Sequence, residues 1–132
     1  MRHLKDQSVK VMKHGEQRYD TAGDWLWLKG IDWYGITKLP LGWKAEQALL
    51  THEMIEANLC REAGITEEAV SHFDTVTVFE VDPKNANDPG RSKFAPYHEQ
   101  HMIATKIEKY IIKTLGLDWK QYDQDYDKLK WR

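Results

Sequence analysis

Several features that mark particular protein classes are absent or scarce in this chain of 132 residues. A single cysteine, Cys60, excludes an internal disulfide and is expected to be a buried, reduced thiol. No apolar run approaches the ~20 residues that a membrane-spanning helix requires, and the polar N-terminal stretch lacks the apolar segment of a signal peptide. The formal net charge of −2 gives no basic excess for nucleic acid. These absences predict a cytoplasmic protein that binds neither membranes nor nucleic acid.

What is present predicts one α+β domain over residues 19–123, preceded by a polar, partly mobile segment (1–18) and followed by a charged tail (124–132). The best strand signal lies within 19–37, where Trp25 and Trp27 alternate with leucines before a Lys29-Gly30 turn. This pattern predicts an antiparallel β-hairpin that packs against helices.

Helical periodicity follows over residues 43–63 and again over 97–115, and Gly64 and Gly116 are placed to end these helices. Thr66 is expected to cap a shorter helix that ends near Asp74, and Asp118 a piece over 119–122. The β-branched stretch 75–81 fits a short strand or an extended segment, and 82–96 reads as a long loop. The predicted fold is a small antiparallel hairpin or sheet packed on two long helices plus short helices.

The first long helix carries two ionisable residues on its apolar side. His52 and Glu56 lie one turn apart near the centre of that side, so their side chains share one surface. A lone buried carboxylate is costly and needs a cation, a donor or a metal as partner. The apolar side is formed by Ala45, Ala48, Leu49, Ile55, Leu59, Cys60 and Ala63.

The second long helix also carries ionisable residues beside its apolar stripe. His101 and Glu108 flank its apolar stripe and His98 lies at the polar edge, so packing the two stripes together would gather imidazoles and carboxylates in one place. Such a cluster is typical of Zn²⁺ or another divalent transition metal. The stripe itself consists of Ala104, Ile107, Ile111 and Leu115.

Helix geometry limits the ligand set. His52 and Glu56 are ~6 Å apart along their axis, whereas His101 and Glu108 are ~10 Å apart along theirs. The one-ion arrangement therefore uses His52, Glu56 and His101 as metal ligands, with Glu108 holding an imidazole N–H and His98 as a further outer residue. The alternative has two ions, with Glu56 bridging them and Glu108 on the second.

Glu53 follows the first candidate ligand directly. In the His-Glu-x-x-His motif, the glutamate after the first histidine activates metal-bound water, so Glu53 is the candidate general base. In this chain Glu56 replaces the second histidine, which keeps the ligand spacing but departs from the motif.

Other interpretations account for the same residues. Pairing His52 with Glu108 and His101 with Glu56 would satisfy all four groups without a metal, as in a non-enzymatic protein-binding module. A nucleotide-hydrolysing enzyme could instead hold Mg²⁺ on glutamates such as Glu53, but the two histidines argue against it because Mg²⁺ prefers oxygen ligands.

Several runs resemble small uncharacterised proteins of tailed phages and prophages. These are Gly23-Asp24-Trp25, the helix from Leu49 to Ala57 containing His-Glu-x-x-Glu, Ala63-Gly64-Ile65-Thr66, Phe73-Asp74, the segment Pro96–Glu108, and Leu115–Trp119 before Tyr122. The resemblance covers about residues 20–123 and implies no defined activity. The matching runs include the candidate site residues His52, Glu53, Glu56, His101 and Glu108. The resemblance also implies that the protein is located in the cytoplasm of an infected host cell.

A more distant resemblance is to zincin metallopeptidases, in which strands precede a helix bearing a His-Glu pair and a later helix supplies the third ligand. The order strand, strand, helix, helix is similar here. The leading hypothesis is therefore a zincin-like metalloprotein that acts as a hydrolase, and the competing one is a phage accessory protein in which the cluster is structural. The substrate, the protein partner and the oligomeric state are not defined by the sequence.

Overall fold

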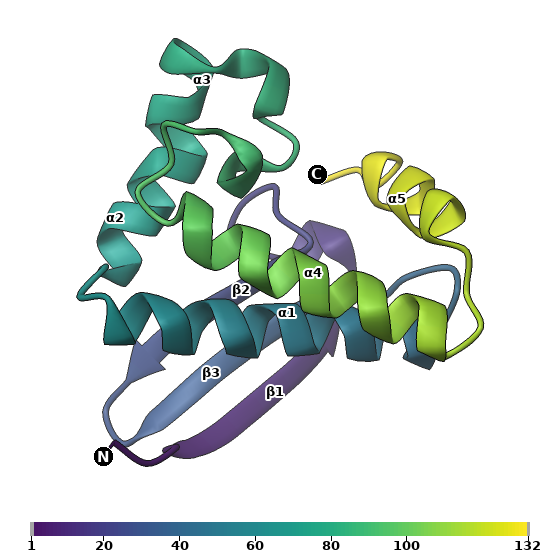
Figure 1. The fold of residues 1–132 in the computed structure, drawn as a ribbon, viewed down its shortest axis with the longest axis horizontal. Helices are drawn as coiled ribbons and strands as arrows, with labels where there is room; N and C mark the ends of the chain where they lie inside the picture. The colour runs from purple at the N-terminus through teal and green to yellow at the C-terminus, as the bar shows by residue number, and fades with distance from the viewer. Residues whose placement is uncertain (1, 132) are drawn as a thin grey trace.

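A computed structural model describes residues 2–131, in which a small sheet is covered on one face by helices (Figure 1). Strands β2 (Gly23–Leu28) and β3 (Ile31–Thr37) pair antiparallel, with Trp25 opposite Tyr34. Gly30 closes their turn at φ 78°, a conformation that side chains rarely adopt. The predicted hairpin is therefore confirmed.

A third strand lies within the polar N-terminal segment. Strand β1 (Asp6–Met12) pairs parallel with β3, giving the strand order β1-β3-β2. The expectation of a purely antiparallel hairpin or sheet is thus corrected to a mixed sheet. Residues 6–11 are all exposed on an edge strand, so they do not alternate between buried apolar and exposed polar side chains. This alternation is the pattern by which a strand is predicted, and the sequence therefore gives no signal for β1.

Helix α1 (Trp43–Glu62) crosses the sheet, and helix α4 (His98–Thr114) lies alongside α1 (Figure 1). These bounds are close to those expected from periodicity. Gly64 and Gly116 follow the two helices at φ 75° and 80°, as expected of glycines that end helices. Because α1 packs against α4, the histidine and glutamate residues on the inner sides of these two helices lie close together.

The segment after α1 is helical for longer than expected. Helix α2 (Glu67–His72) begins at Thr66, whose side chain accepts a hydrogen bond from the Ala69 amide. It continues directly into a π-helical stretch (Phe73–Thr77) and helix α3 (Val78–Val81). The expected strand or extended segment at 75–81 is therefore wrong: the β-branched residues there continue a helix that α2 has already nucleated.

The long loop 82–96 contains two single 3₁₀ turns, Pro83–Asn85 and Pro89–Arg91, and otherwise no regular structure. Helix α5 (Trp119–Asp127) is capped by Asp118, as predicted, and continues past the expected end at Tyr122 into the segment read as a charged tail. None of the helices within residues 2–131 combines the length and the apolar character that spanning a bilayer requires.

Two apolar clusters pack on either side of the polar group at the middle of α1. One joins β2, β3 and the C-terminal half of α1, where Cys60 is fully buried, to Phe73 and Val78. The other joins the N-terminal half of α1 to α4 and to Tyr122 of α5. The polar residues between the clusters are thereby held in a rigid surrounding.

Candidate metal centre

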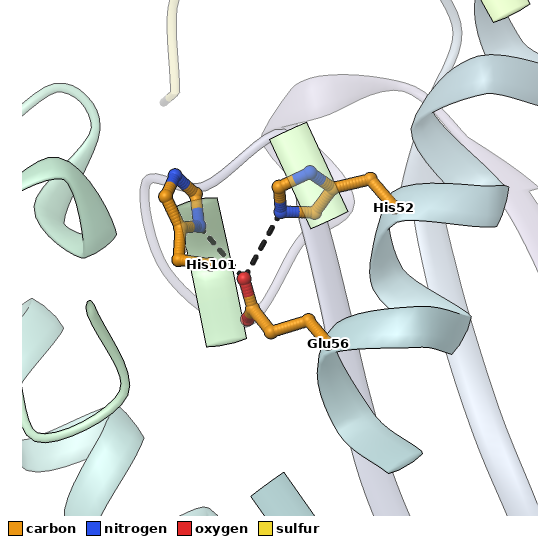
Figure 2. A group of neighbouring side chains, drawn as sticks. All are labelled: His52, Glu56 and His101. Atoms are coloured by element: carbon orange, nitrogen blue, oxygen red, sulfur yellow. Dashed lines mark hydrogen bonds and ion pairs between the residues drawn. The ribbon is translucent and has the colours of Figure 1, made fainter. Parts of the chain in front are cut away.

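Glu56 lies at the centre of the polar group, between the two histidines (Figure 2). Its Oε2 is 3.0 Å from His52 Nε2 on the same helix and 2.7 Å from His101 Nδ1 on α4. Their ligand atoms all lie within 4.8 Å of one another, and all three residues are buried. The structure therefore brings together the three residues predicted as metal ligands, in a cluster that could hold a metal ion.

The other ring nitrogen of each histidine meets a second carboxylate. His101 Nε2 is 3.0 Å from Asp88 Oδ1, and His52 Nδ1 is 2.7 Å from Glu108 Oε1. The His52–Glu108 contact has the length of an ion pair but not the alignment of a hydrogen bond, so Nδ1 has no hydrogen-bond partner among the described residues. Metal-binding histidines usually have one ring nitrogen on the ion and the other beside a carboxylate or carbonyl, and both histidines have carboxylates at these two places.

Aromatic side chains hold these carboxylates in place. Trp25 Nε1 on β2 donates a 3.2 Å hydrogen bond to Glu56 Oε1, the oxygen that faces away from the histidines. The Tyr122 hydroxyl on α5 donates to Glu108, and the Tyr97 hydroxyl, just before α4, donates to Asp74. The acidic groups are thus fixed from several elements.

Burial and neighbouring charges move the pKa values in opposite directions. Burial alone would raise the pKa of Glu56, but hydrogen bonds from His101 and His52 outweigh it and hold the pKa below its usual range. Burial alone would lower the pKa of His101, but the Asp88 and Glu56 carboxylates raise it to about 10. Glu108 and Glu56 likewise raise the pKa of His52 well above its usual value. The metal-free cluster therefore holds protons on its histidines and charge on Glu56.

Glu53, the candidate general base, is buried on α1 beside this cluster. Burial, followed by the charge of Glu56, raises its pKa well above the ordinary value. Gly23 on β2 packs so closely that a Cβ placed there would lie 2.2 Å from Glu53 Oε1. A raised pKa makes the ionised carboxylate a stronger proton acceptor than an exposed glutamate, which suits a general base.

Carboxylates outnumber cationic groups around the two histidines. Glu53, Glu56, Asp74, Asp88 and Glu108 surround His52 and His101, and the raised pKa values of Glu53 and Asp74 favour the neutral form of these two acids. A cavity of about 40 Å³ opens beside His52, Glu53 and Glu56. It is large enough to hold a water molecule, and the carboxylate oxygens and imidazole nitrogens beside it are groups that bind divalent transition metals.

His98, the other residue predicted near the site, is half-buried and does not contact these ligands directly. Its Nδ1 is 2.9 Å from the Gly90 carbonyl oxygen. Gly90 in turn packs against the His101 ring, where a Cβ would lie 2.3 Å from Cγ. His98 is therefore connected to the site through the loop residue Gly90, which packs against His101.

The sequence does not predict a role in the site for Trp25, Asp74, Asp88, Tyr97 or Tyr122. The alternation around Trp25 indicates packing of the hairpin on the helices or a place in an aromatic groove, and Asp88 lies in an Asn-Asp-Pro-Gly run whose composition indicates only a loop. Tyr122 was placed at the end of a short helix. Each reaches the site through a contact between segments distant in sequence, for which local periodicity gives no signal.

Comparison with known proteins gives no relative: no family model, no curated protein and no solved structure matches this chain. The residues themselves are the basis for assigning a function.

Proposed function

We propose that this protein is a metal-dependent hydrolase that binds a divalent transition metal, best matched by Zn²⁺, through His52 Nε2, Glu56 Oε2 and His101 Nδ1. The observation that carries the proposal is the shared orientation of the two histidines. Each directs one nitrogen at Glu56 Oε2 and the other at a carboxylate. Two nitrogens and one oxygen fit Zn²⁺ better than Mg²⁺, which prefers oxygen ligands.

The donor spacing supports an ion of this size. Zn²⁺ bonds of about 2.0–2.2 Å place tetrahedral ligand atoms roughly 3.4 Å apart. The His52–Glu56 and His101–Glu56 separations are 3.0 and 2.7 Å, so small outward rotations of these side chains would admit the ion. Asp88 and Glu108 would then hold the outer nitrogens.

In this proposal Glu53 is the general base. Zn²⁺ supplies Lewis acidity that brings the pKa of water close to neutral. Glu53, whose own pKa is raised by burial, takes the proton from the attacking water and passes it to the leaving group. The His52-Glu53 order and the third ligand on a later helix are the points of similarity to zincins, and the helix motifs those to phage-encoded proteins.

The proposal is tested by elemental analysis of the purified protein and by Zn²⁺ titration after chelator treatment. One ion per chain is expected, and His52→Ala or His101→Ala should weaken Zn²⁺ binding at least about 100-fold, because each removes a ligand. His3→Ala, which alters an exposed histidine, is the matched control. A wild-type protein without stoichiometric metal, or equal affinity in all variants, would show the metal assignment to be wrong.

The base role needs a separate measurement. Glu53→Gln should keep Zn²⁺ binding but lose about 100-fold or more of any hydrolytic activity found with amide or ester substrates, as expected for a general base. Full activity in this variant would exclude the role.

A second candidate function rests on the same distances. The His101–Glu56 and His52–Glu108 contacts, both 2.7 Å, neutralise four buried groups without an ion. The cluster would then fix the packing of α1 against α4 in a non-enzymatic, protein-binding module. Thermal stability with and without a chelator separates the two functions, as described in the Discussion.

A further inference from the structure

A larger cavity adjoins the candidate metal centre. Its volume is about 420 Å³, within the range typical of small-molecule sites. We call it the aromatic cavity. The lining residues that matter here are Tyr19, Asp20, Asp74, Phe79, Asn87 and Trp131.

The aromatic cavity and the metal centre share walls. Tyr19, Asp74 and Asn87 line both the large cavity and the water-sized one beside His52, Glu53 and Glu56. Asn87 precedes Asp88, the carboxylate that contacts His101 Nε2. A molecule held in the larger cavity would therefore extend toward the candidate ligands.

The lining has the chemistry of a cation site. Tyr19, Phe79 and Trp131 bring aromatic rings from three distant segments, and ring faces attract cations. Asp20 adds a carboxylate, and Asp74 adds a buried carboxyl group whose pKa is raised to about 8. Among the described residues that line the cavity none is lysine or arginine, although the Arg18 guanidinium lies over the Tyr19 ring from outside the lining. The Asp20 side chain is 70 % exposed, although one oxygen contacts His14, so it can meet a ligand from solvent.

We propose that the aromatic cavity binds a basic side chain, an alkylammonium or guanidinium group, of a peptide substrate. An anionic side chain would meet the Asp20 carboxylate and the acceptor oxygens of Asp74, whereas an ammonium or guanidinium group can donate to both and face the aromatic rings. As a substrate subsite the cavity rests on the proposed function, because the amide bond beside the basic residue would lie at the metal centre. In that step the water oxygen bonds to the amide carbon, the C–N bond breaks, and the water proton passes through Glu53 to the leaving amine.

The probe is Nα-acetyl-lysine methylamide, compared with its neutral analogue Nα-acetyl-norleucine methylamide by calorimetric titration of chelator-treated protein. The lysine derivative should bind about tenfold more tightly, equivalent to about 1.4 kcal/mol. Phe79→Ala and Asp20→Asn should each weaken its binding about fivefold, since they remove a ring face and a carboxylate. Both residues are well exposed (58 % for Phe79), so the fold should tolerate these changes.

Phe94→Ala is the matched control, because Phe94 is 67 % exposed and lies outside the cavity lining. Equal binding of the two derivatives, no saturable binding of the lysine derivative, or an equal loss in Phe94→Ala would overturn the inference. Binding by chelator-treated protein supports the cavity assignment whether or not the protein takes up Zn²⁺. Failure to take up Zn²⁺ contradicts only the proposed hydrolase function, so the two failures are distinguishable.

Discussion

At the scale of single residues, the site depends on which partner each buried polar atom has. Glu56 engages both carboxylate oxygens, one with the two histidines and the other with Trp25. Because the group is buried, removing any partner leaves a charged or polar atom without compensation, which is costly. This interdependence favours conservative substitutions over alanine when roles are tested.

Asp74 offers a prediction about pH. Burial raises its pKa to about 8, although the Tyr97 hydroxyl donates to it. The folded protein therefore keeps a proton that the unfolded chain loses above about pH 4, so this group lowers stability progressively between about pH 4 and pH 8. In Asp74→Asn, the free energy of unfolding should fall less steeply over that window, by at most about 1.4 kcal/mol per pH unit.

Urea unfolding at about pH 5, 6, 7 and 8 measures this slope. Asparagine can still accept the Tyr97 hydrogen bond, so the packing should be retained. Asp6→Asn on the exposed strand β1 is the control and should leave the slope as in the wild type. Parallel curves for wild type and Asp74→Asn would contradict the prediction.

At the scale of elements, the loop 82–96 supplies one wall of the site. Gly90 packs against the His101 ring while Asp88, two residues earlier, contacts Nε2 of the same ring. The loop thus fixes both the position of the imidazole and which nitrogen faces Glu56. This accounts for a loop of this length within a compact fold.

Gly90→Ala is predicted to impair metal binding. The added Cβ would lie 2.3 Å from His101 Cγ, so the ring or the loop must move. Zn²⁺ affinity should fall about 10- to 100-fold, as for loss of a residue that orients a ligand, and stability by about 1–3 kcal/mol. Calorimetric titration and urea unfolding measure the two effects.

Gly15→Ala is the matched control, because a Cβ at Gly15 has no atom within 4 Å among the described residues. It should change stability by less than about 0.5 kcal/mol. Unchanged Zn²⁺ affinity in Gly90→Ala would show that the loop does not set the geometry of His101.

The elements predicted from the sequence are those with local signals. The hairpin turn at Gly30 and the caps Thr66 and Asp118 depend on neighbouring residues, and the structure places them as expected. The buried side of α4 is rotated from the expected stripe, because Ile107, Ile111 and Leu115 are only half-buried while His101, Glu108 and Ile112 are buried. The placement of His52, Glu56 and His101 together followed from packing one stripe on the other. Helix periodicity and capping residues are therefore enough to predict these parts of the fold and of the site.

The missed elements depend on distant contacts. Strand β1 is polar because its side chains face solvent, and only its pairing with β3 makes it a strand. The composition of Thr75–Val78 favours a strand, but the stretch is helical because it directly continues helix α2. Asp88 and Trp25 reach the site from a loop and a strand, which only the folded chain brings near α1.

At the scale of the whole molecule, the cluster connects the sheet, α1, α4, the loop and α5. If an ion binds only the native state, it stabilises all these contacts together. Zn²⁺ at 100 times its dissociation constant should raise the free energy of unfolding by about 2.7 kcal/mol, and a chelator should reverse this. Thermal unfolding monitored by circular dichroism measures the shift.

The stabilisation should increase with pH up to about pH 10, the raised pKa of His101, because both histidines must release protons to bind the ion. His52→Ala should abolish it, while His3→Ala should retain it. Identical melting with Zn²⁺ and with chelator would favour the structural ion-pair core over the metalloprotein.

The sequence separation of Glu56 and His101 has a consequence for biosynthesis. The two residues lie 45 positions apart, so at about 5–20 residues per second the ribosome needs about two to nine seconds to pass from one to the other. During that interval the acidic half of the site on α1 has emerged without its second imidazole. In the proposed metalloprotein, metal loading would therefore be a late step of synthesis, and the newly made α1 would keep its polar centre hydrated until α4 is made.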